Sequence, residues 1–208
     1  MLIDFLGDSI TAGAAASSMD KCYVERVGQL LNCSVINHGI GGTRIAHQKE
    51  ASSEAIYDQD FCQRLKDLDK NADYVFVFGG TNDYGHGLAP IGTPEDCSPD
   101  TFYGAVNYLA TNLLKMYRRN QITFILPLYR LNEDNPYGEG SKKTPSLALE
   151  GYRQIIREVL DKYQIKYLDF RQEIGKAENN PLLFDGLHPN DLGHEVLANL
   201  IAGYIKSL

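Results

Sequence analysis

The chain has 208 residues, of which 43% are hydrophobic and 23% are charged, and its formal net charge is −7. This length favours a single domain over residues 1–208. The acidic balance argues against a nucleic-acid partner, because nucleic-acid binding usually leaves a basic patch. No apolar run approaches the roughly 18 residues of a membrane span, and the first residues lack the features of a secretory signal. We therefore expect a cytoplasmic protein without a membrane span, and the sequence leaves its oligomeric state open.

The cysteine and histidine residues show no metal-binding pattern. The four cysteines form no CxxC pair, and no Cys/His cluster has zinc-finger spacing. Surface or core roles are favoured for the histidines that do not pair at metal-ligand spacing, which are His38, His47, His86 and His194. Nucleotide-binding glycine motifs are absent as well. We expect neither a metal nor a cofactor.

Apolar runs that predict strands alternate along the chain with segments of helical periodicity. Strands are expected at 2–6, 34–37, 74–78, 122–126 and 165–170, and helices at 23–31, 61–68, 99–119, 146–163 and 189–205. Ser98 is expected to cap the third helix, with Pro99 at its first position, and Leu192 is expected on the inner face of the last helix. Run 74–78 is apolar throughout, which is typical of a central strand covered on both faces.

Strands separated by helical crossovers predict an α/β protein with a parallel sheet and helices on both faces. Ligands bind such sheets beyond the carboxyl ends of the strands. Polar or glycine-rich segments follow the first three expected strands, at 7–9, 39–42 and 80–83. These segments are therefore expected at one edge of the sheet.

The residues at this edge fit acyl transfer. Ser9 is a candidate nucleophile, which needs an adjacent base because serine alone is poorly reactive. His188 is the candidate base, and Asp185, three residues earlier, can accept its Nδ1 proton and leave Nε2 free for the serine. The N–H groups of Ser9 and Gly42 and the side-chain amide of Asn82 are the expected oxyanion donors.

Four segments resemble the conserved blocks of the GDSL or SGNH hydrolases, in the family's order. They are Gly7-Asp8-Ser9-Ile10-Thr11 (with Ile10 in place of the usual Leu), Asn37 to Thr43, Gly80-Thr81-Asn82-Asp83, and Asp185-Gly186-Leu187-His188-Pro189. The resemblance implies a flavodoxin-like three-layer α/β/α sandwich with about five parallel strands. It also implies esterase, lipase or carbohydrate-deacetylase chemistry without a metal, with the functional glycine at Gly42 and the functional asparagine at Asn82.

Each of these residues also has an ordinary structural interpretation, as a turn or capping residue, so the combined pattern is what favours catalysis. Asp83 is expected to bond loop backbone. Asp8 is expected to brace the Ser9 loop and is also a candidate substrate contact. The other candidate contacts are Tyr84 and His86, which follow the third block, and Tyr129, which begins a polar loop at 129–145.

Three functions remain open at this point. The first is an esterase acting on small or carbohydrate-linked acyl groups, which the polar loop favours. The second is a lipase or lysophospholipase acting on longer chains. The third is a catalytically silent binding module with the same fold, which the complete set of candidate site residues disfavours.

Overall fold

A parallel sheet of five strands organises the computed structural model, which describes residues 1–208. The strand order is β2-β1-β3-β4-β5, and every neighbouring pair is parallel. The strands are β1 (Leu2–Gly7), β2 (Ser34–Gly39), β3 (Tyr74–Phe78), β4 (Ile122–Ile125) and β5 (Lys166–Leu168). β3 lies at the centre, as its apolar run predicts.

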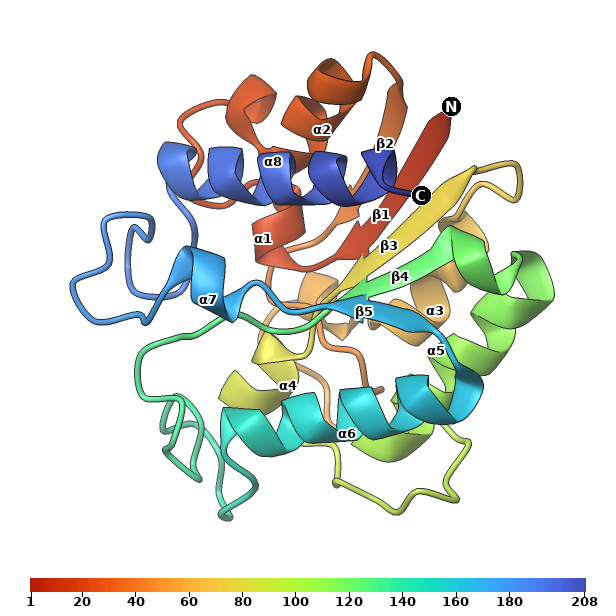
Figure 1. Ribbon diagram of the computed structural model, residues 1–208. Coiled ribbons are helices and arrows are strands. Elements are labelled where there is room, and N and C mark those ends of the chain that lie inside the picture. The colour runs from red at the N-terminus through yellow and green to blue at the C-terminus, as the bar shows by residue number, and fades with distance from the viewer.

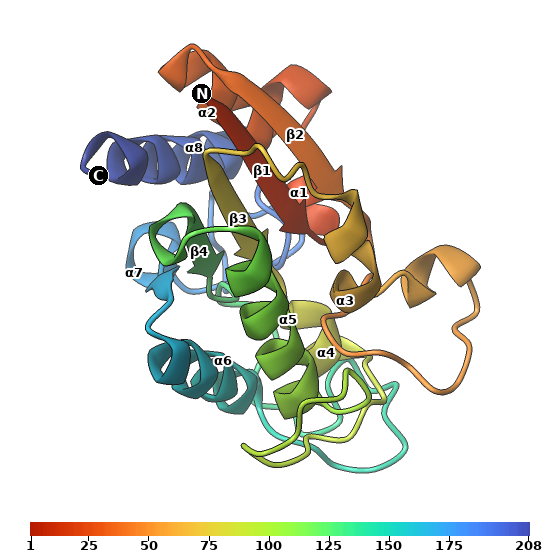
Figure 2. The ribbon, with the colours of Figure 1, turned by 90° about the vertical axis from the view of Figure 1, so that its right-hand side faces the viewer.

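Helices cover both faces of this sheet (Figure 1). On one face α2 (Tyr23–Leu31) packs against α8 (Asp191–Lys206), and on the other α5 (Phe102–Met116) packs against α6 (Leu149–Tyr163) beside α3 (Phe61–Arg64). Figure 2 shows the same separation from the side. The predicted three-layer α/β/α architecture is therefore confirmed.

Alternate residues of the central strands enter the two cores. Phe76 and Phe78 face the core under α2 and α8, whereas Val75 and Val77 face the core under α5 and α6. All four side chains are buried, because a strand points successive side chains to opposite faces. The central strand thus joins two hydrophobic cores.

Three short helices stand at the carboxyl edge of the sheet, where ligands bind in this class of fold. They are α1 (Ser9–Ala12), α4 (Thr81–Gly85) and α7 (Arg171–Ile174), which follow β1, β3 and β5. Figure 1 shows them at the end toward which the strands point. The candidate site residues Ser9 and Asn82 belong to the first two.

Several predicted boundaries are wrong. The helix expected from Pro99 begins at Phe102, because Thr101 rather than Ser98 caps it and its Oγ1 accepts the N–H of Gly104 at 3.1 Å. The helix expected at 146–163 is α6, which begins only at Leu149. The helix expected at 61–68 is α3, which ends at Arg64 and is followed by a 3-10 turn (Leu65–Asp67). The strand expected to 170 ends at Leu168.

The last helix also differs from its prediction. Pro189 pairs with Leu183 in an isolated bridge instead of opening the helix. Asn190 is the cap, and its Oδ1 accepts the N–H of Leu192 at 3.0 Å and that of Gly193 at 3.2 Å. Leu192, expected inside, is 59% exposed because it lies on the outer side of the helix with Glu195 and Asn199, whereas Gly193 and His194 of the same turn are buried.

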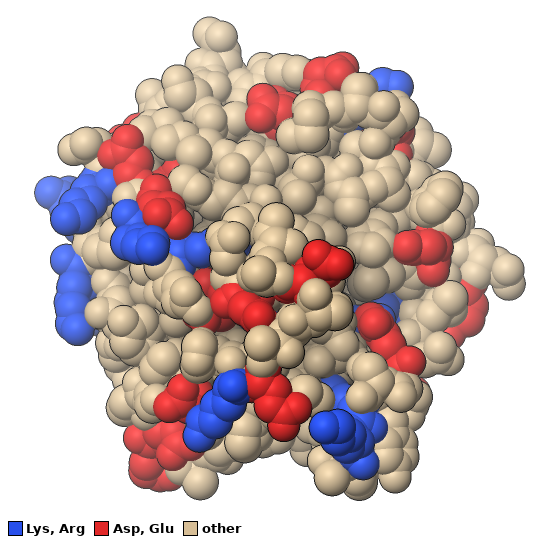
Figure 3. All heavy atoms as spheres, turned by 180° about the vertical axis from the view of Figure 1, so that it is seen from behind, with Lys and Arg blue, Asp and Glu red and all other residues tan.

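None of the helices combines the length and apolar character that a membrane crossing needs. The face opposite that of Figure 1 carries acidic and basic side chains close together (Figure 3). This mixture accords with a chain that has 27 acidic and 20 basic residues.

Candidate active site

Ser9 begins α1 directly after the first strand. The carboxylate of Asp8 caps this helix by accepting the N–H of Ile10 at 3.0 Å. Close packing fixes the turn, since a Cβ on Gly39 would lie 2.1 Å from the Ala12 nitrogen. Glycine at this point of β2 therefore lets α1 approach the sheet. The result is a serine held rigidly at the carboxyl edge.

His188 reaches Ser9 from a loop that precedes α8. Its Nε2 lies 3.0 Å from the Ser9 Oγ, and its Nδ1 lies 2.7 Å from Asp185 Oδ2. The other Asp185 oxygen accepts the N–H of Leu187 at 3.0 Å and of His188 at 2.8 Å. An ionised Asp185 accepts the Nδ1 proton, which leaves the Nε2 lone pair facing the serine. The structure thus brings together Ser9, His188 and Asp185, the three residues that the sequence analysis expects to act together.

The pKa of Asp185 is lowered, so this carboxylate keeps its charge. Burial alone would raise the pKa, but the backbone and ring hydrogen bonds from His188 outweigh burial. The charge of a nearby imidazolium and the N–H of Leu187 lower the pKa further. The ionised form is the one that orients the ring.

A group of contacts that sequence reasoning missed holds the two segments together. Asp191, at the start of α8, accepts the Ser17 N–H at 2.7 Å, the Ser17 hydroxyl at 2.8 Å and the Lys21 ammonium at 3.0 Å. These bonds hold the pKa of Asp191 well below its usual range. Nearby, His194 is fully buried, with its Nε2 3.1 Å from the Ala14 carbonyl oxygen. Both contacts fix α8 against the loop that follows Ser9.

Gly42 lies beside Ser9 in a conformation that suits glycine. Its φ is +73°, in the left-handed region, and a Cβ there would lie 2.6 Å from the ring of Tyr57. Gly42, Ser9, Asn82 and His188 line one depression of about 690 Å³. The predicted oxyanion donors therefore border the same space as the serine.

Asn82 projects from α4, and both ends of its amide are bonded. Its Nδ2 donates to the Thr43 carbonyl at 3.0 Å, and its Oδ1 lies 3.3 Å from His86 Nε2. Asn82 is 5% exposed, and it borders the depression through an amide group fixed from two sides. Of the predicted substrate contacts, only His86 lines this space.

Asp83 has the structural role expected of it. Its carboxylate accepts the N–H of Ile45 at 2.8 Å and that of Ala46 at 2.9 Å. Burial raises its pKa to about 6, against the lowering effect of these bonds and of the charges on Arg44 and Lys142. Asp83 thus fixes the loop that carries Arg44 beside the depression.

The other three predicted substrate contacts, Asp8, Tyr84 and Tyr129, do not line this depression. Asp8 is buried, and its carboxylate is engaged in capping α1. Burial raises its pKa to about 6. Tyr84 is buried, and its hydroxyl lies within hydrogen-bond distance of the carbonyl oxygens of Asn132 and Asn135. Tyr129 stacks under the Arg171 guanidinium at 4.2 Å, in a different depression. The packing partners of these three side chains lie in other segments or in the turn itself, and the sequence does not show them.

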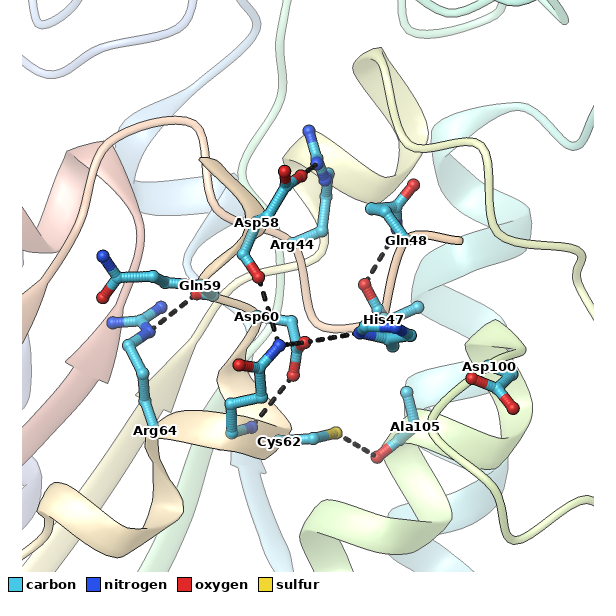
Figure 4. Close-up of polar contacts among 12 residues, drawn as sticks. Arg44, His47, Gln48, Asp58, Gln59, Asp60, Cys62, Arg64, Asp100 and Ala105 are labelled. Carbon is cyan, nitrogen blue, oxygen red and sulfur yellow. Dashed lines mark hydrogen bonds and ion pairs between the residues drawn. The ribbon is translucent and has the colours of Figure 1, made fainter. Parts of the chain in front are cut away.

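Two buried arginines, Arg64 and Arg44, support the site, and no sequence motif predicts this role. Arg64 donates to the carbonyls of His38 and Gly7 and to the Thr43 hydroxyl, so it joins the ends of β2 and β1 to the loop after Gly42. Arg44 donates to Asp58 at 3.1 Å. Figure 4 shows this contact and the neighbouring polar network around Asp60. Only the fold reveals these roles, since the partners of each arginine lie in other segments of the chain.

The loop expected at the edge of the site borders the depression through Glu139 and Ser141. Lys142 anchors it, donating to the Asp83 carbonyl at 2.9 Å and to the Tyr152 hydroxyl at 2.7 Å. No three His, Cys, Asp or Glu side chains gather in an arrangement suited to a metal ion. The depression brings together the Ser9 hydroxyl, the His188 imidazole and further polar side chains.

Comparison with known proteins assigns the chain to a class. The family model of the GDSL-like lipase/acylhydrolase family matches residues 5–196. The five-stranded parallel sheet with helices on both faces is consistent with the fold of this family, and the chain belongs to the GDSL-like lipase/acylhydrolase family. The protein is therefore a hydrolase of ester bonds. No functionally curated protein matches the chain in sequence.

Solved structures share the fold over nearly the whole chain. A protein from Lactobacillus plantarum has 26% identity and a TM-score of 0.80, covering 99% of this chain and 96% of its own. A lipase/acylhydrolase from Enterococcus faecalis has 23% identity and a TM-score of 0.68, covering 99% and 95%. An α/β hydrolase enzyme from the metagenome of Lake Arreo has 18% identity and a TM-score of 0.64, covering 97% and 93%.

Proposed function

We propose that the protein is a serine esterase that uses Ser9 as nucleophile, His188 as general base and Asp185 to orient the base. One observation carries the proposal. Ser9 Oγ, His188 Nε2, His188 Nδ1 and Asp185 Oδ2 form a continuous line of hydrogen bonds, at 3.0 and 2.7 Å, although 179 residues separate the serine from the histidine. Serine gains reactivity when an adjacent base can take its proton.

The proposed reaction has two acyl-transfer steps. Ser9 Oγ attacks the ester carbonyl carbon while His188 Nε2 takes the hydroxyl proton. The resulting oxyanion accepts hydrogen bonds from the N–H groups of Ser9 and Gly42 and from the amide of Asn82. The intermediate collapses, and His188 gives its proton to the departing alcohol. Water then attacks the acyl-serine, with His188 again taking the proton, and the acid and free Ser9 are released.

The side chains around Ser9 favour a polar ester as substrate. Beyond the serine, the depression is bordered by Arg44, Ser52, Ser53, Glu139 and Ser141. Hydroxyl and charged groups of this kind suit hydrogen bonding to a sugar or another polar moiety. We therefore infer small or carbohydrate-linked acyl groups as substrates. The second candidate is a longer-chain lipase, which the apolar Leu88 and Leu187 on the same border favour.

Covalent labelling tests the mechanism. A fluorophosphonate probe, which reacts with activated serines, is expected to modify Ser9 alone, as read by peptide mass spectrometry. Ser9→Ala should abolish hydrolysis of p-nitrophenyl acetate, whereas Ser98→Ala, at an exposed serine elsewhere, should not. Unchanged turnover by Ser9→Ala would refute the proposal. Faster turnover of acetate than of a long-chain ester supports the small-acyl assignment, and the reverse supports the lipase.

A further inference from the structure

A line of hydrogen bonds leads from a charged pair to the side chain of Asn82. Arg44 donates from Nη2 to Asp58 Oδ1 at 3.1 Å and to the Ser52 hydroxyl. Its Nη1 lies 3.1 Å from His86 Nδ1, and His86 Nε2 lies 3.3 Å from Asn82 Oδ1. Figure 4 shows the first contact, between Arg44 and Asp58. The line thus ends on an amide that borders the same depression as Ser9.

Donor chemistry decides where each proton lies. A guanidinium carries donors only, so Nδ1 of His86 has to accept. The neutral ring then carries its proton on Nε2 and donates it to Asn82 Oδ1. With its oxygen so occupied, the Asn82 amide directs its nitrogen away from His86. One Nδ2 proton goes to Thr43 O, at 3.0 Å, and the second remains for another acceptor.

We propose that His86, fixed in one tautomer by Arg44, is a positioning residue that orients the Asn82 amide toward the oxyanion. The inference rests on the proposed function, because it concerns the donor that the esterase mechanism assigns to Asn82. A pre-oriented donor stabilises the transition state more than a mobile one, since no reorganisation is needed as charge develops. His86 acts through Asn82 and takes no proton from the substrate.

The surroundings keep this arrangement rigid and the His86 ring neutral. Arg44 is 3% exposed, and Asp58, which holds it, itself accepts the N–H and the hydroxyl of Ser52. The pKa of His86 is lowered, chiefly by burial. The Glu139 carboxylate opposes this effect, and the Arg44 charge adds to it. A second proton on Nδ1 would face the guanidinium donor, so the neutral ring is the form that fits.

A double-mutant cycle tests whether His86 acts through Asn82. His86→Phe keeps a planar ring without donors, and we expect kcat to fall about tenfold with KM unchanged, as is usual when a supporting hydrogen bond behind a functional group is lost. His86→Gln, whose amide can accept from Arg44 and donate to Asn82, should recover most of the loss. In an Asn82→Ala background, His86→Phe should cause no further loss. If the losses of kcat caused by His86→Phe and Asn82→Ala multiply in the double variant, the proposal is overturned.

A matched control and a spectroscopic measurement complete the test. His47→Phe changes a histidine of the neighbouring loop whose partner Asp60 also accepts the Gln63 N–H, so kcat should stay within about twofold of wild type. In ¹⁵N NMR, His86 should appear as the Nε2-protonated tautomer, and Arg44→Met should release this preference. An Nδ1-protonated ring in the wild type contradicts the inference.

The outcomes separate this inference from the proposed function. If the fluorophosphonate probe does not modify Ser9, the esterase mechanism itself fails. If the probe modifies Ser9 and Asn82→Ala lowers kcat, while His86→Phe is equally harmful with and without Asn82, only the positioning role fails. A thermal-unfolding measurement on each variant shows whether a loss of kcat reflects unfolded protein.

Discussion

Gly42→Ala is the sharpest perturbation of the proposed oxyanion site. The φ of Gly42 is +73°, and an L-residue in the left-handed region costs about 1–2 kcal/mol. The new Cβ would also lie 2.6 Å from Cδ1 and 2.8 Å from Cε1 of Tyr57. Real Cβ atoms do not approach ring carbons this closely, so either the ring or the peptide has to move.

Movement of the Tyr57 ring relieves the clash alone, whereas relief of the φ strain rotates the backbone at residue 42, whose N–H is the proposed donor. Loss of one oxyanion donor lowers kcat by about 100- to 1,000-fold. We therefore expect a decrease of this size in kcat on p-nitrophenyl acetate, with little change in KM, because the bond forms only as charge develops. The left-handed strain should also lower the melting temperature by roughly 2–8 °C, at about 2–4 °C for each kcal/mol.

Two further variants divide the effect into its parts. In Gly41→Ala the new Cβ meets Ser9 Cβ at 3.8 Å, an ordinary van der Waals contact, so the loss should be smaller. Adding Tyr57→Ala to Gly42→Ala removes the clash and keeps the φ strain, so part of kcat should return. Wild-type kcat in Gly42→Ala would refute the reasoning, because the N–H of Gly42 would then not stabilise the transition state.

Four other predictions follow from the same structure. Asn82→Ala should lower kcat by about 100- to 1,000-fold, and an increase in KM alone would show ground-state binding instead. Asp185→Asn should lower kcat by about 10,000-fold, because the amide no longer fixes the His188 tautomer; a loss below tenfold contradicts this role. The Asp83 carboxyl should titrate near pH 6 by ¹³C NMR; since its pKa is raised in the folded state, its contribution to stability is present at low pH and lost as pH rises through about 6, and titration near pH 4 contradicts this. Leu109→Ala, at a fully buried position, should lower the free energy of unfolding by about 2–5 kcal/mol in urea denaturation, and a loss below 1 kcal/mol would contradict the packing.

Local signals in the sequence were sufficient to predict the layers of the fold. The apolar run 74–78 predicts a doubly covered strand, and β3 (Tyr74–Phe78) is central. The strand order, by contrast, depends on pairings between segments far apart in the chain. The predicted start of α5, at Pro99, is wrong for a related reason. The N–H groups of Phe102 and Tyr103 donate to the carbonyls of Pro90 and Ile91, and these contacts fix where the helix begins.

For the site, the motif residues were predictable and their supports were not. Ser9, Asp185 and His188 lie in segments whose residue types suit one chemistry, and the structure brings them together. Asp191 gave no such signal, because no motif or chemistry in the sequence links it to its partner Ser17. Arg44 likewise acquires its contact with His86 only when the loop after Gly42 meets the end of α4. Long-range contacts of this kind follow from the fold and leave no local periodicity.

The position of His188 after all five strands has a consequence for protein synthesis. As the chain grows, the whole sheet emerges before the imidazole does. In the mechanism proposed above, a nascent chain with a complete sheet holds Ser9 without a proton acceptor beside it. The serine gains its proton acceptor when the loop that carries His188 lies beside it, as in the folded structure. In that mechanism, completion of the catalytic group is therefore a late event in the synthesis of the chain.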